Sequence, residues 1–517
     1  MGEGILQILT TKFRRESKIA FFSTFAVALL IHLYKFANTL PNHDSLYNFY
    51  SDQNVLGSGR WALSAACAMS SFYDLPWLNG VMSCIFIALT AVVVVALFRL
   101  KNPILIGLAG ALLAASPSTT ETFFFLYTAD GYMVAMFLAA LAVYVSRMGT
   151  KGWRRYVLSA LCICVSCGIY QAYVSFAMLL ALCHFIDELL RGEYSKKQYW
   201  LWALRQAAVY VAALAAYYVI WKLFMRFSGT AANNYLGISE VGKISPELIY
   251  GGLINAIRTT VIFFLQWNVF KHGLTMYSAL NIIFVVLMAL GIVAASVKSG
   301  LAKKPYAIIL LALSLLAMIP AACIWFFTSE SMEYRVMMLH SYTLLFVLGG
   351  VIYERWMGPK LKDAMCIVLL VMVINNAVLA NISYFYLNLC YERSYAEGVE
   401  MMCDIHDYQD EYEINRIAIV GDRSGDIGRQ LIDPETGRFT PAGQIQTLNG
   451  FTAKSLLTNA EHILPFLRNV YGMDIKSASN ATHAELAEME TVKSMGLWPA
   501  ADSISVIEDI LVIKIGN

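Results

Sequence analysis

The stretch that decides the fold runs from residue 77 to residue 98 and reads WLNGVMSCIFIALTAVVVVALF. It contains no charged side chain, and it is longer than the roughly 20 residues that a helix needs to cross the hydrocarbon core of a bilayer. Arg99 and Lys101 follow it at once. An apolar run of this length that ends in basic residues predicts a transmembrane helix whose last turn meets a membrane surface.

The composition extends this interpretation to the whole chain. Of its 517 residues, 58% are hydrophobic and 14% are charged, and the mean hydropathy is +0.58. A soluble domain carries roughly 25% charged residues, so this chain has too few polar side chains to keep its apolar surface in water. The sequence therefore predicts an integral membrane protein that contacts the lipid bilayer. The net charge of +2 argues against a nucleic-acid partner.

Similar apolar runs recur along the chain and predict a mainly α, polytopic helical membrane protein with about eleven spans. We place the spans at residues 19–38, 77–98, 103–117, 127–146, 156–172, 174–190, 203–224, 274–297, 306–327, 335–353 and 364–386. The fifth and sixth spans are short and share the tight link Gly168-Ile-Tyr-Gln171, so a re-entrant hairpin is the alternative for this pair. Residues 248–267 carry Arg258 and glycines and are predicted to lie at the membrane interface.

Lysines and arginines predict the orientation because they concentrate in cytoplasmic loops. With the N-terminus in the cytoplasm, five basic groups all fall in inner loops. These groups are Arg99/Lys101, Arg147/Lys151/Arg154/Arg155, Arg191/Lys196/Lys197, Lys298/Lys303/Lys304 and Arg355/Lys360/Lys362. An odd number of spans then places the C-terminal region outside.

The composition changes near residue 388, where long apolar runs stop and charges become frequent. Residues 415–421 are predicted to form a strand, residues 453–470 a helix, and residues 504–515 two strands around a Glu-Asp turn. We therefore expect two domains. Residues 1–387 form a polytopic membrane domain, and residues 388–517 form a small, soluble extracytoplasmic α/β domain.

Three acids lie just beyond the outer ends of predicted spans and are the candidate catalytic residues. Asp44 follows the first span, Asp130 begins the fourth, and Glu121 lies in the outer loop between the third and fourth spans. A carboxylate in a partly desolvated pocket can accept a proton from a hydroxyl group. For any one acid, a solvated loop position or a helix cap is the simpler interpretation. Asp44 is favoured because His43 and nearby aromatic residues provide a lining suited to a sugar.

Two arginines lie on the outer side, against the trend of the basic loops. Arg60 and Arg335 each suit a phosphate, because the planar guanidinium makes bidentate contacts. Arg335 has the alternative of pairing with a nearby acid such as Glu333, which we group with it in the candidate binding set. Tyr170 and Gln171, in the link between the fifth and sixth spans, provide groups that hydrogen-bond to a sugar, although interfacial tyrosines often serve only as anchors.

Other signals are weaker. Residues 421–428 are glycine-rich and follow a strand, but they lack the spacing of a dinucleotide-binding loop, so a simple turn is favoured. Asp404, His406 and Asp407 are more consistent with a solvated helix face than with a metal site. No cofactor is predicted with certainty, and a divalent metal is kept as a possibility.

Several motifs together identify a family. They are a basic tail before the first span, Asn42-His-Asp44, Gly57-Ser-Gly-Arg60-Trp61, Asp130 after an aromatic run, Gly168-Ile-Tyr-Gln171, Arg335-Val, Trp498-Pro499 and the strands within 504–515. In this order they resemble the bacterial Gtr type II glucosyltransferase family, which modifies O-antigen and other surface glycans. The resemblance covers about the whole chain and is best over residues 19–190.

The resemblance implies a type C glycosyltransferase fold in the bacterial cytoplasmic membrane, with an extracytoplasmic active site. The donor would be a polyprenyl-phosphate sugar, with glucose as the sugar in this family, and the acceptor an envelope polysaccharide such as O-antigen. A flippase and a donor-making synthase would be partners. Asp44 would then activate the acceptor, Asp130 would orient the acceptor or assist the leaving phosphate, and Arg60 and Arg335 would hold the donor phosphate. Where many type C enzymes pair two acids, this chain has His43 beside Asp44, which leaves open whether one acid or two act and whether a metal takes part.

Three alternatives remain at this stage. A transporter or flippase of lipid-linked sugars would place its polar groups near the bilayer midplane, whereas here they gather at the outer edge. A membrane O-acyltransferase would need a histidine at membrane depth, for which His32 is the candidate. A non-catalytic assembly or anchoring protein is the third.

Overall fold

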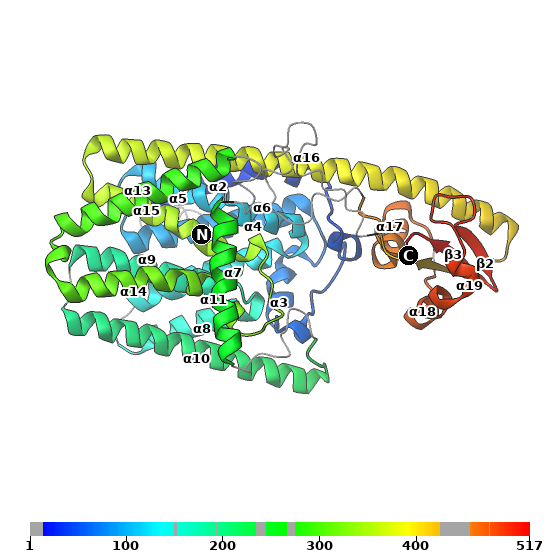
Figure 1. Cartoon of the computed structure of the whole chain (residues 1–517), viewed down its shortest axis with the longest axis horizontal. Helices are drawn as coiled ribbons and strands as arrows, with labels where there is room; N and C mark the ends of the chain where they lie inside the picture. Colours follow the sequence, from blue (N-terminus) through cyan, green and yellow to red (C-terminus); the bar gives the residue numbers. More distant parts are fainter. Residues whose placement is uncertain are drawn as a thin grey trace, which may run out of the picture. The chain divides into compact units, whose positions relative to one another are not determined.

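The computed structural model describes residues 14–148, 152–192, 195–233, 245–265, 274–423, 455–474 and 476–516. The chain divides into two compact units, whose elements are labelled in Figure 1. Unit 1 comprises Met1–Ala37, Asp52–Asn381 and Gln446–Leu448, and unit 2 comprises Asn38–Ser51, Ile382–Ile445 and Asn449–Asn517. A short segment that follows the first predicted span is thus part of the same unit as the C-terminal region.

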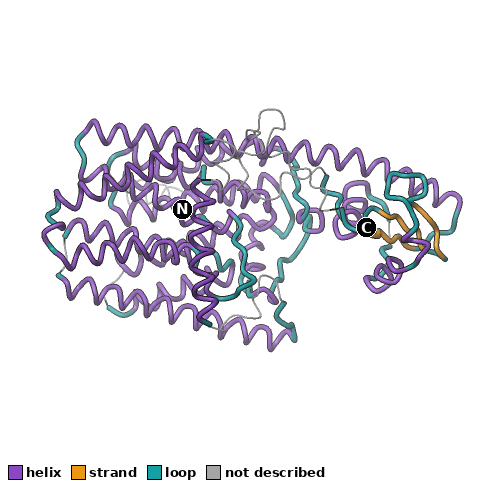
Figure 2. The backbone as a smooth tube through the Cα atoms, viewed as in Figure 1, coloured by secondary structure: helices purple, strands orange, loops and turns teal. Residues whose placement is uncertain are grey.

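Unit 1 is built from helices, most of them long (Figure 2). They are α2 (Arg15–Ala37), α3 (Leu63–Cys67), α4 (Pro76–Phe98), α5 (Pro103–Ala114), α6 (Pro117–Thr122), α7 (Leu126–Met148), α8 (Arg154–Ile169), α9 (Tyr173–Arg191), α10 (Lys196–Ser228), α11 (Pro246–Leu265), α13 (Met276–Lys298), α14 (Pro305–Ala322), α15 (Thr343–Trp356) and the first part of α16 (Pro359–Glu411). The mainly α membrane fold predicted from the sequence is confirmed.

Within the described residues, nine helices are long and apolar enough to cross a membrane. Eight of them coincide with predicted spans, and the ninth is α11, which the sequence places at the interface. The other three predicted spans, 103–117, 156–172 and 335–353, overlap the shorter helices α5, α8 and α15, which have 12, 16 and 14 residues. Each predicted span therefore overlaps a helix, and of the three shorter helices α5 is the one found to be apolar throughout.

Local sequence signals fix many helix ends. Proline stands at the start of α4, α5, α6 and α14, where its missing N–H costs nothing because the first N–H groups of a helix have no partner within it. Asn102 and Thr275 cap α5 and α13 by accepting hydrogen bonds from backbone N–H groups. Gly192 ends α9 in the left-handed conformation.

A buried ionic network joins three helices at one end of unit 1. Asp187 pairs with Arg355 and, at 3.2 Å, with Arg191. Its neighbour Glu188 pairs with Arg147, and its Oε1 lies 3.3 Å from His184 Nε2. Removing one member would leave a buried charge uncompensated, so the network holds the ends of α7, α9 and α15 together.

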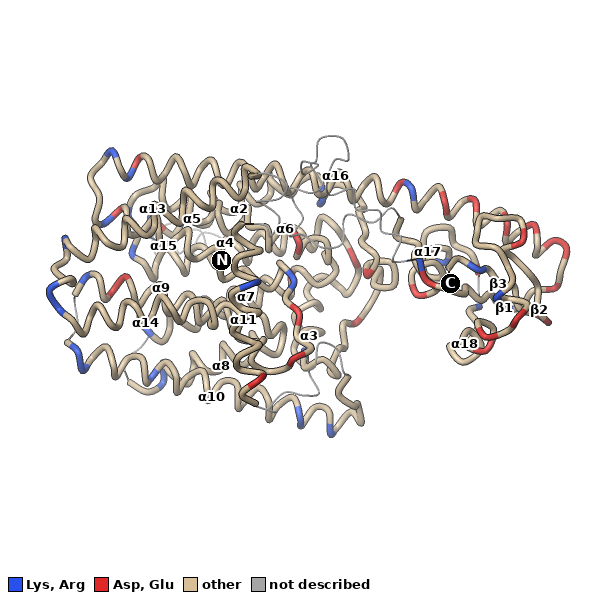
Figure 3. The backbone as a smooth tube through the Cα atoms, viewed as in Figure 1, with Lys and Arg blue, Asp and Glu red and all other residues tan. Residues whose placement is uncertain are grey.

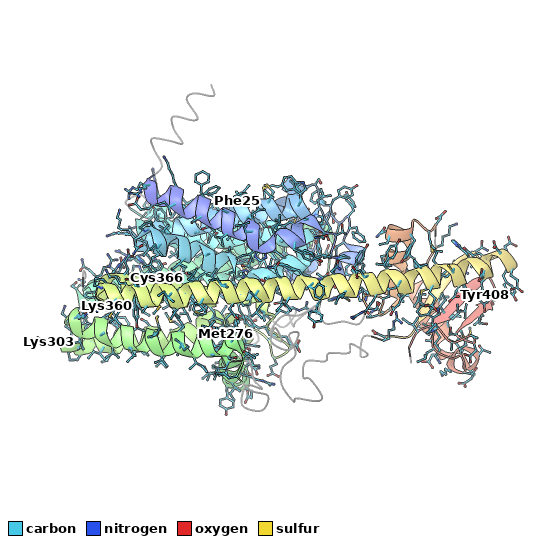
Figure 4. The ribbon with its side chains drawn as sticks, turned by 90° about the horizontal axis from the view of Figure 1, so that it is seen from above. Phe25, Met276, Lys303, Lys360, Cys366 and Tyr408 are labelled. Carbon is cyan, nitrogen blue, oxygen red and sulfur yellow. The ribbon has the colours of Figure 1, made fainter. Side chains whose placement is uncertain are left out.

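At least one residue from each of the five predicted basic groups makes a contact at this end of unit 1, where lysines and arginines cluster (Figure 3). Arg147, Arg191 and Arg355 take part in the network, Lys298 Nζ donates to the carbonyl of Trp356 at 2.7 Å, and the N–H of Lys101 donates to Glu354. Lys303 and Lys360 mark the same end in Figure 4, with Met276 at the other end of α13. The predicted inner loops therefore lie together.

In its described residues, unit 2 contains the second part of α16, three strands and three further α-helices. The strands are β1 (Arg416–Val420), β2 (Ile504–Ile507) and β3 (Ile510–Lys514), and the helices are α17 (Ala460–Tyr471), α18 (Asn480–Glu488) and α19 (Glu490–Lys493). β3 is central, parallel to β1 and antiparallel to β2. These strands agree with the predicted ones, and Glu508 (φ 58°) and Asp509 form the predicted turn.

The predicted helix at 453–470 is confirmed only in its second part, as α17, because residues 455–459 form a loop that ends at the N-cap residue Asn459; residues 453 and 454 lie outside the described part of the chain. Of the predicted glycine-rich turn at 421–428, only Gly421, Asp422 and Arg423 are described. Helix α16 has 53 residues and passes from one unit into the other at Ile382, so the domain boundary expected between residues 387 and 388 falls inside a helix.

Candidate functional site

The loop that contains Gly57-Ser-Gly-Arg60-Trp61 is held by side chains from α10 and from the link between α8 and α9. The carbonyl of Leu56 accepts from Trp221 Nε1 at 2.8 Å, and that of Ser58 accepts from Gln171 Nε2 at 2.6 Å. The carbonyl of Gly59 accepts from the hydroxyl of Tyr217 at 3.1 Å. Three anchored carbonyls within four residues leave the loop little freedom, so the side chain of Arg60 starts from a fixed position.

Two glycines of the predicted motifs make this anchoring possible. Gly59 has φ +80°, and a Cβ there would lie 2.3 Å from the Tyr217 hydroxyl that binds its carbonyl. A Cβ on Gly168 would lie 2.4 Å from the ring of Trp61. The carbonyl of Gly168 also accepts from the N–H of Ala62 at 2.8 Å. The two motifs therefore meet in the structure.

Arg60 lies against two stacked tyrosines. Its Nη1 donates to the hydroxyl of Tyr132 at 3.1 Å, and its guanidinium carbon lies 4.9 Å from the centre of the Tyr170 ring. The two rings are parallel within 11° and 4.2 Å apart. Aromatic faces attract a cation and restrict its motion. A half-buried guanidinium held in this way is well suited to bind an anion such as a phosphate.

Asp130 precedes Tyr132 on the first turns of α7 and is completely buried. The hydroxyl of Ser70 and the N–H of Gly131 lie within electrostatic reach of its carboxyl group. Among the described residues, however, neither of its oxygens has a hydrogen-bond partner of normal geometry. Because a buried polar group without a partner is costly, such a group in a native fold calls for a functional explanation.

Glu121 lies on α6, a short polar helix whose six residues are all buried. Its carboxylate accepts a hydrogen bond from the N–H of Met337, in the 3₁₀ turn η8 (Val336–Met338) that follows Arg335. Glu121 thus fixes the backbone next to Arg335. Arg335 itself is half-buried, and Glu333 is exposed.

Asp44 and His43 belong to unit 2, where Asp44 begins the 3₁₀ turn η1 (Asp44–Tyr47). The Asp44 Oδ1 accepts from the hydroxyl of Tyr47 at 2.9 Å and lies 3.4 Å from His43 Nε2. The side chain is 24% exposed. A carboxylate that is hydrogen-bonded on one oxygen and accessible to solvent has the arrangement that a general base needs.

The predicted site residues therefore form three groups. Arg60, Tyr170 and Gln171 come together around one loop, Glu121 and Arg335 are joined through Met337, and His43 contacts Asp44. Asp130 lies on α7 close to Tyr132, the partner of Arg60. Among the described residues, no hydrogen bond or ion pair joins Glu333 to any of these groups.

Sequence reasoning missed Tyr132, Tyr217, Trp221 and His462. Tyr217 and Trp221 are four residues apart on α10, so they share one helix face, and both are buried with polar tips bound to the Arg60 loop. A pair of aromatic residues with polar tips inside an apolar run is the signal that indicates such a role. His462 has no comparable local signal.

Two other candidate sites find less support. His32, the candidate for acyl transfer, is fully buried, with Nε2 2.9 Å from the carbonyl of Ala114 and its ring packed on Phe123. Among the described residues, no group of three or more His, Cys, Asp or Glu side chains is arranged to hold a metal ion.

Comparison with known families matches residues 33–353, more than half of the chain, to the family described as Glucosyl transferase GtrII. Comparisons with curated proteins and with solved structures gave no match. The match contains every residue of the predicted site, from His43 to Arg335, and it agrees with the resemblance found in the sequence motifs. The chain is a member of the GtrII glucosyl transferase family.

Proposed function

We propose that this glucosyltransferase moves glucose from a polyprenyl phosphate to an envelope polysaccharide, such as O-antigen, on the outer face of the bacterial cytoplasmic membrane. The observation that carries the proposal is the family match over residues 33–353, because it includes all the acids and arginines of the candidate site. The apolar helices of unit 1 supply a surface on which a lipid-borne donor can be held.

The donor phosphate is assigned to Arg60. Its guanidinium donates to the hydroxyl of Tyr132 and lies against the face of the Tyr170 ring, and its loop is anchored at three carbonyls. A positive group held in advance stabilises the phosphate as negative charge develops on the leaving oxygen. Arg335, next to the turn fixed by Glu121, is assigned to the same phosphate, with Glu333 in the loop before it.

The acceptor hydroxyl is assigned to Asp44. This carboxylate takes the hydroxyl proton as the acceptor oxygen attacks the anomeric carbon, while the bond between that carbon and the phosphate oxygen breaks and polyprenyl phosphate leaves. One displacement inverts the anomeric configuration, so a β-linked donor gives an α-glucoside. Asp130, buried near Tyr132, orients the acceptor or assists the leaving phosphate, and Tyr170 and Gln171 hydrogen-bond the sugar.

The source of the donor explains the need for lipid. Nucleotide sugars are cytoplasmic, so an outward site requires glucose that has crossed the membrane on a carrier. A synthase that loads polyprenyl phosphate and a flippase that turns the product outward are therefore the functional partners.

The test is transfer of radiolabelled glucose from polyprenyl-phosphate glucose to a surface glycan, in membranes that contain matched amounts of each protein. Wild type transfers label, and Asp44→Asn loses about a hundredfold or more of the rate, as expected for removal of a general base. The matched control is Asp52→Asn. Asp52 is an exposed acid eight positions further along the chain, and its Oδ1 accepts only a local backbone hydrogen bond from Asn54.

Absence of transfer by wild type with glucose and with a panel of other lipid-linked sugars would refute the proposed function. Near-normal turnover by Asp44→Asn, with transfer by wild type intact, would instead remove the assignment of the base and leave the transferase activity in place. Equal losses in Asp44→Asn and Asp52→Asn would point to a general effect of charge in this segment.

A further inference from the structure

The segment that carries Asp44 is folded together with the C-terminal part of the chain. Asn38–Ser51 belongs to unit 2, along with α17 and the three-stranded sheet. Within the segment, the turn is shaped by Asn42, whose Oδ1 accepts from the N–H of Ser45 at 2.8 Å and from its hydroxyl at 3.0 Å. Asn42 and Ser45 are both buried, so this turn is a defined structure.

Helix α17 packs against this turn. Leu46 is fully buried in a core that includes Ile463, Phe466 and Leu467 of α17. The side chain of Asn469 donates to the carbonyl of Leu46 at 3.2 Å. The helix therefore holds the turn both through apolar packing and through the backbone.

His462, in the first turn of α17, reaches the two residues that contact the Asp44 carboxylate. Its ring centre lies 5.5 Å from that of His43 and 6.3 Å from that of Tyr47, with the Tyr47 ring parallel within 11°. Tyr47 and His43 are the residues whose polar atoms approach Asp44 Oδ1. The two residues that contact the Asp44 carboxylate, His43 and Tyr47, thus both pack against the imidazole ring of His462.

The surroundings of His462 fix its orientation and keep it neutral. Its Nδ1 lies 2.7 Å from the hydroxyl of Thr458. Burial, together with the nearby His43, lowers the pKa of His462 from 6.5 to about 4, against the opposing effect of Asp44 and Asp422. Because the His462 ring is neutral, it can pack against His43 and Tyr47 without forming an ion pair with the Asp44 carboxylate.

We propose that His462 is a positioning residue for Asp44: its ring holds Tyr47 and His43, and these hold Oδ1 so that Oδ2 faces the acceptor hydroxyl. Among the described residues, the side-chain contacts of Asp44 all involve Oδ1. A residue of the C-terminal region then positions the catalytic base, although His462 lies beyond the region matched to the family. The inference rests on the proposed role of Asp44 as the base.

Steady-state kinetics of the full-length protein in membranes test the inference, with rates expressed per folded enzyme. His462→Ala lowers kcat about tenfold and leaves KM for the lipid donor unchanged, because a misplaced base affects the chemical step and not donor binding. His462→Phe keeps the ring and stays within about threefold of wild type, because the supporting ring face is retained. The matched control is His483→Ala, since His483 also lies in the first turn of a unit 2 helix but bonds only to the backbone of Ser479.

A double-mutant cycle separates positioning from general stability. Tyr47→Phe removes the hydroxyl that binds Oδ1, and it also lowers kcat about tenfold. Because both side chains act through the same carboxylate, His462→Ala/Tyr47→Phe is no slower than about the worse of the single variants.

The inference is overturned if His462→Ala keeps the wild-type kcat, if it raises donor KM with kcat unchanged, or if the two losses multiply in the double variant. It is also overturned if His462→Phe is as slow as His462→Ala. If Asp44 is not the base, the result is different, because Asp44→Asn would then retain turnover in the same assay.

Discussion

Arg60 lies between a tyrosine hydroxyl and a tyrosine ring, and this placement predicts its response to substitution. Arg60→Lys keeps the positive charge but loses the planar fork and the stacking on Tyr170, so kcat/KM for the lipid donor should fall about tenfold or more. Arg226→Lys, on the exposed last turn of α10, is the control and should change little. Equal activity of Arg60→Lys and wild type would show that the guanidinium does not hold the donor.

His462 predicts a pH dependence of stability in unit 2. Between its ordinary pKa of 6.5 and its lowered pKa of about 4, the unfolded chain binds a proton that the folded chain does not. Stability is therefore full above pH 6.5 and falls as the pH is lowered toward 4. Hydrogen exchange of the α17 amides in the full-length protein, corrected for intrinsic rates, should report easier opening over this range. His462→Phe should have a weaker dependence, and an unchanged dependence would exclude His462 as its source.

The sequence pattern predicts the candidate site residues whose local surroundings are unusual. It does not reveal residues that join the candidate site only through contacts between distant parts of the chain. Asp44 and Arg60 are conspicuous because charged residues border apolar runs. The hydrogen bond between Asn469 and Leu46 joins positions 423 apart, and His462 becomes part of the Asp44 surroundings through the same packing. No local periodicity reports such a contact, since it exists only after the chain has folded.

Among the helices, the end of α8 next to the Arg60 loop leaves no room for added volume at Gly168. Gly168→Ala would place a methyl group 2.4 Å from the Trp61 ring, which must move together with the loop that carries Arg60. Overpacking of this kind costs about 1–3 kcal/mol, and we expect lower transferase activity and a lower melting temperature. Gly251→Ala on α11 meets nothing within 4 Å and serves as the control. Wild-type activity in Gly168→Ala would show that the loop adapts without loss.

Helix positions were predictable because apolar runs and proline starts are local signals. Each of the eleven predicted spans overlaps a helix, although the run at 335–353 begins with the 3₁₀ turns that include η8. The length of α16 was not predictable from hydropathy. Its apolar part ends near the expected boundary, but the helix continues to Glu411, because hydropathy reports contact with lipid and not where backbone hydrogen bonding stops.

For the chain as a whole, the gathering of five basic groups at one end of unit 1 predicts an orientation. If this end is cytoplasmic, the C-terminal unit lies outside and its exposed Cys403 should react with a membrane-impermeant thiol reagent added to intact cells. Cys403→Ser should abolish this labelling. A cysteine introduced as Lys303→Cys, in the basic loop before α14, should react only after the membrane is opened. The reverse pattern would invert the proposed topology.

The identity of the donor can be tested with purified protein in liposomes that contain the acceptor glycan. Labelled glucose is supplied either on polyprenyl phosphate or on a nucleotide, with no donor-making synthase present. We predict transfer from the lipid donor alone, with inversion at the anomeric carbon. Transfer from the nucleotide sugar at an equal rate, without any lipid donor, would contradict the proposal that a lipid-linked sugar is the substrate.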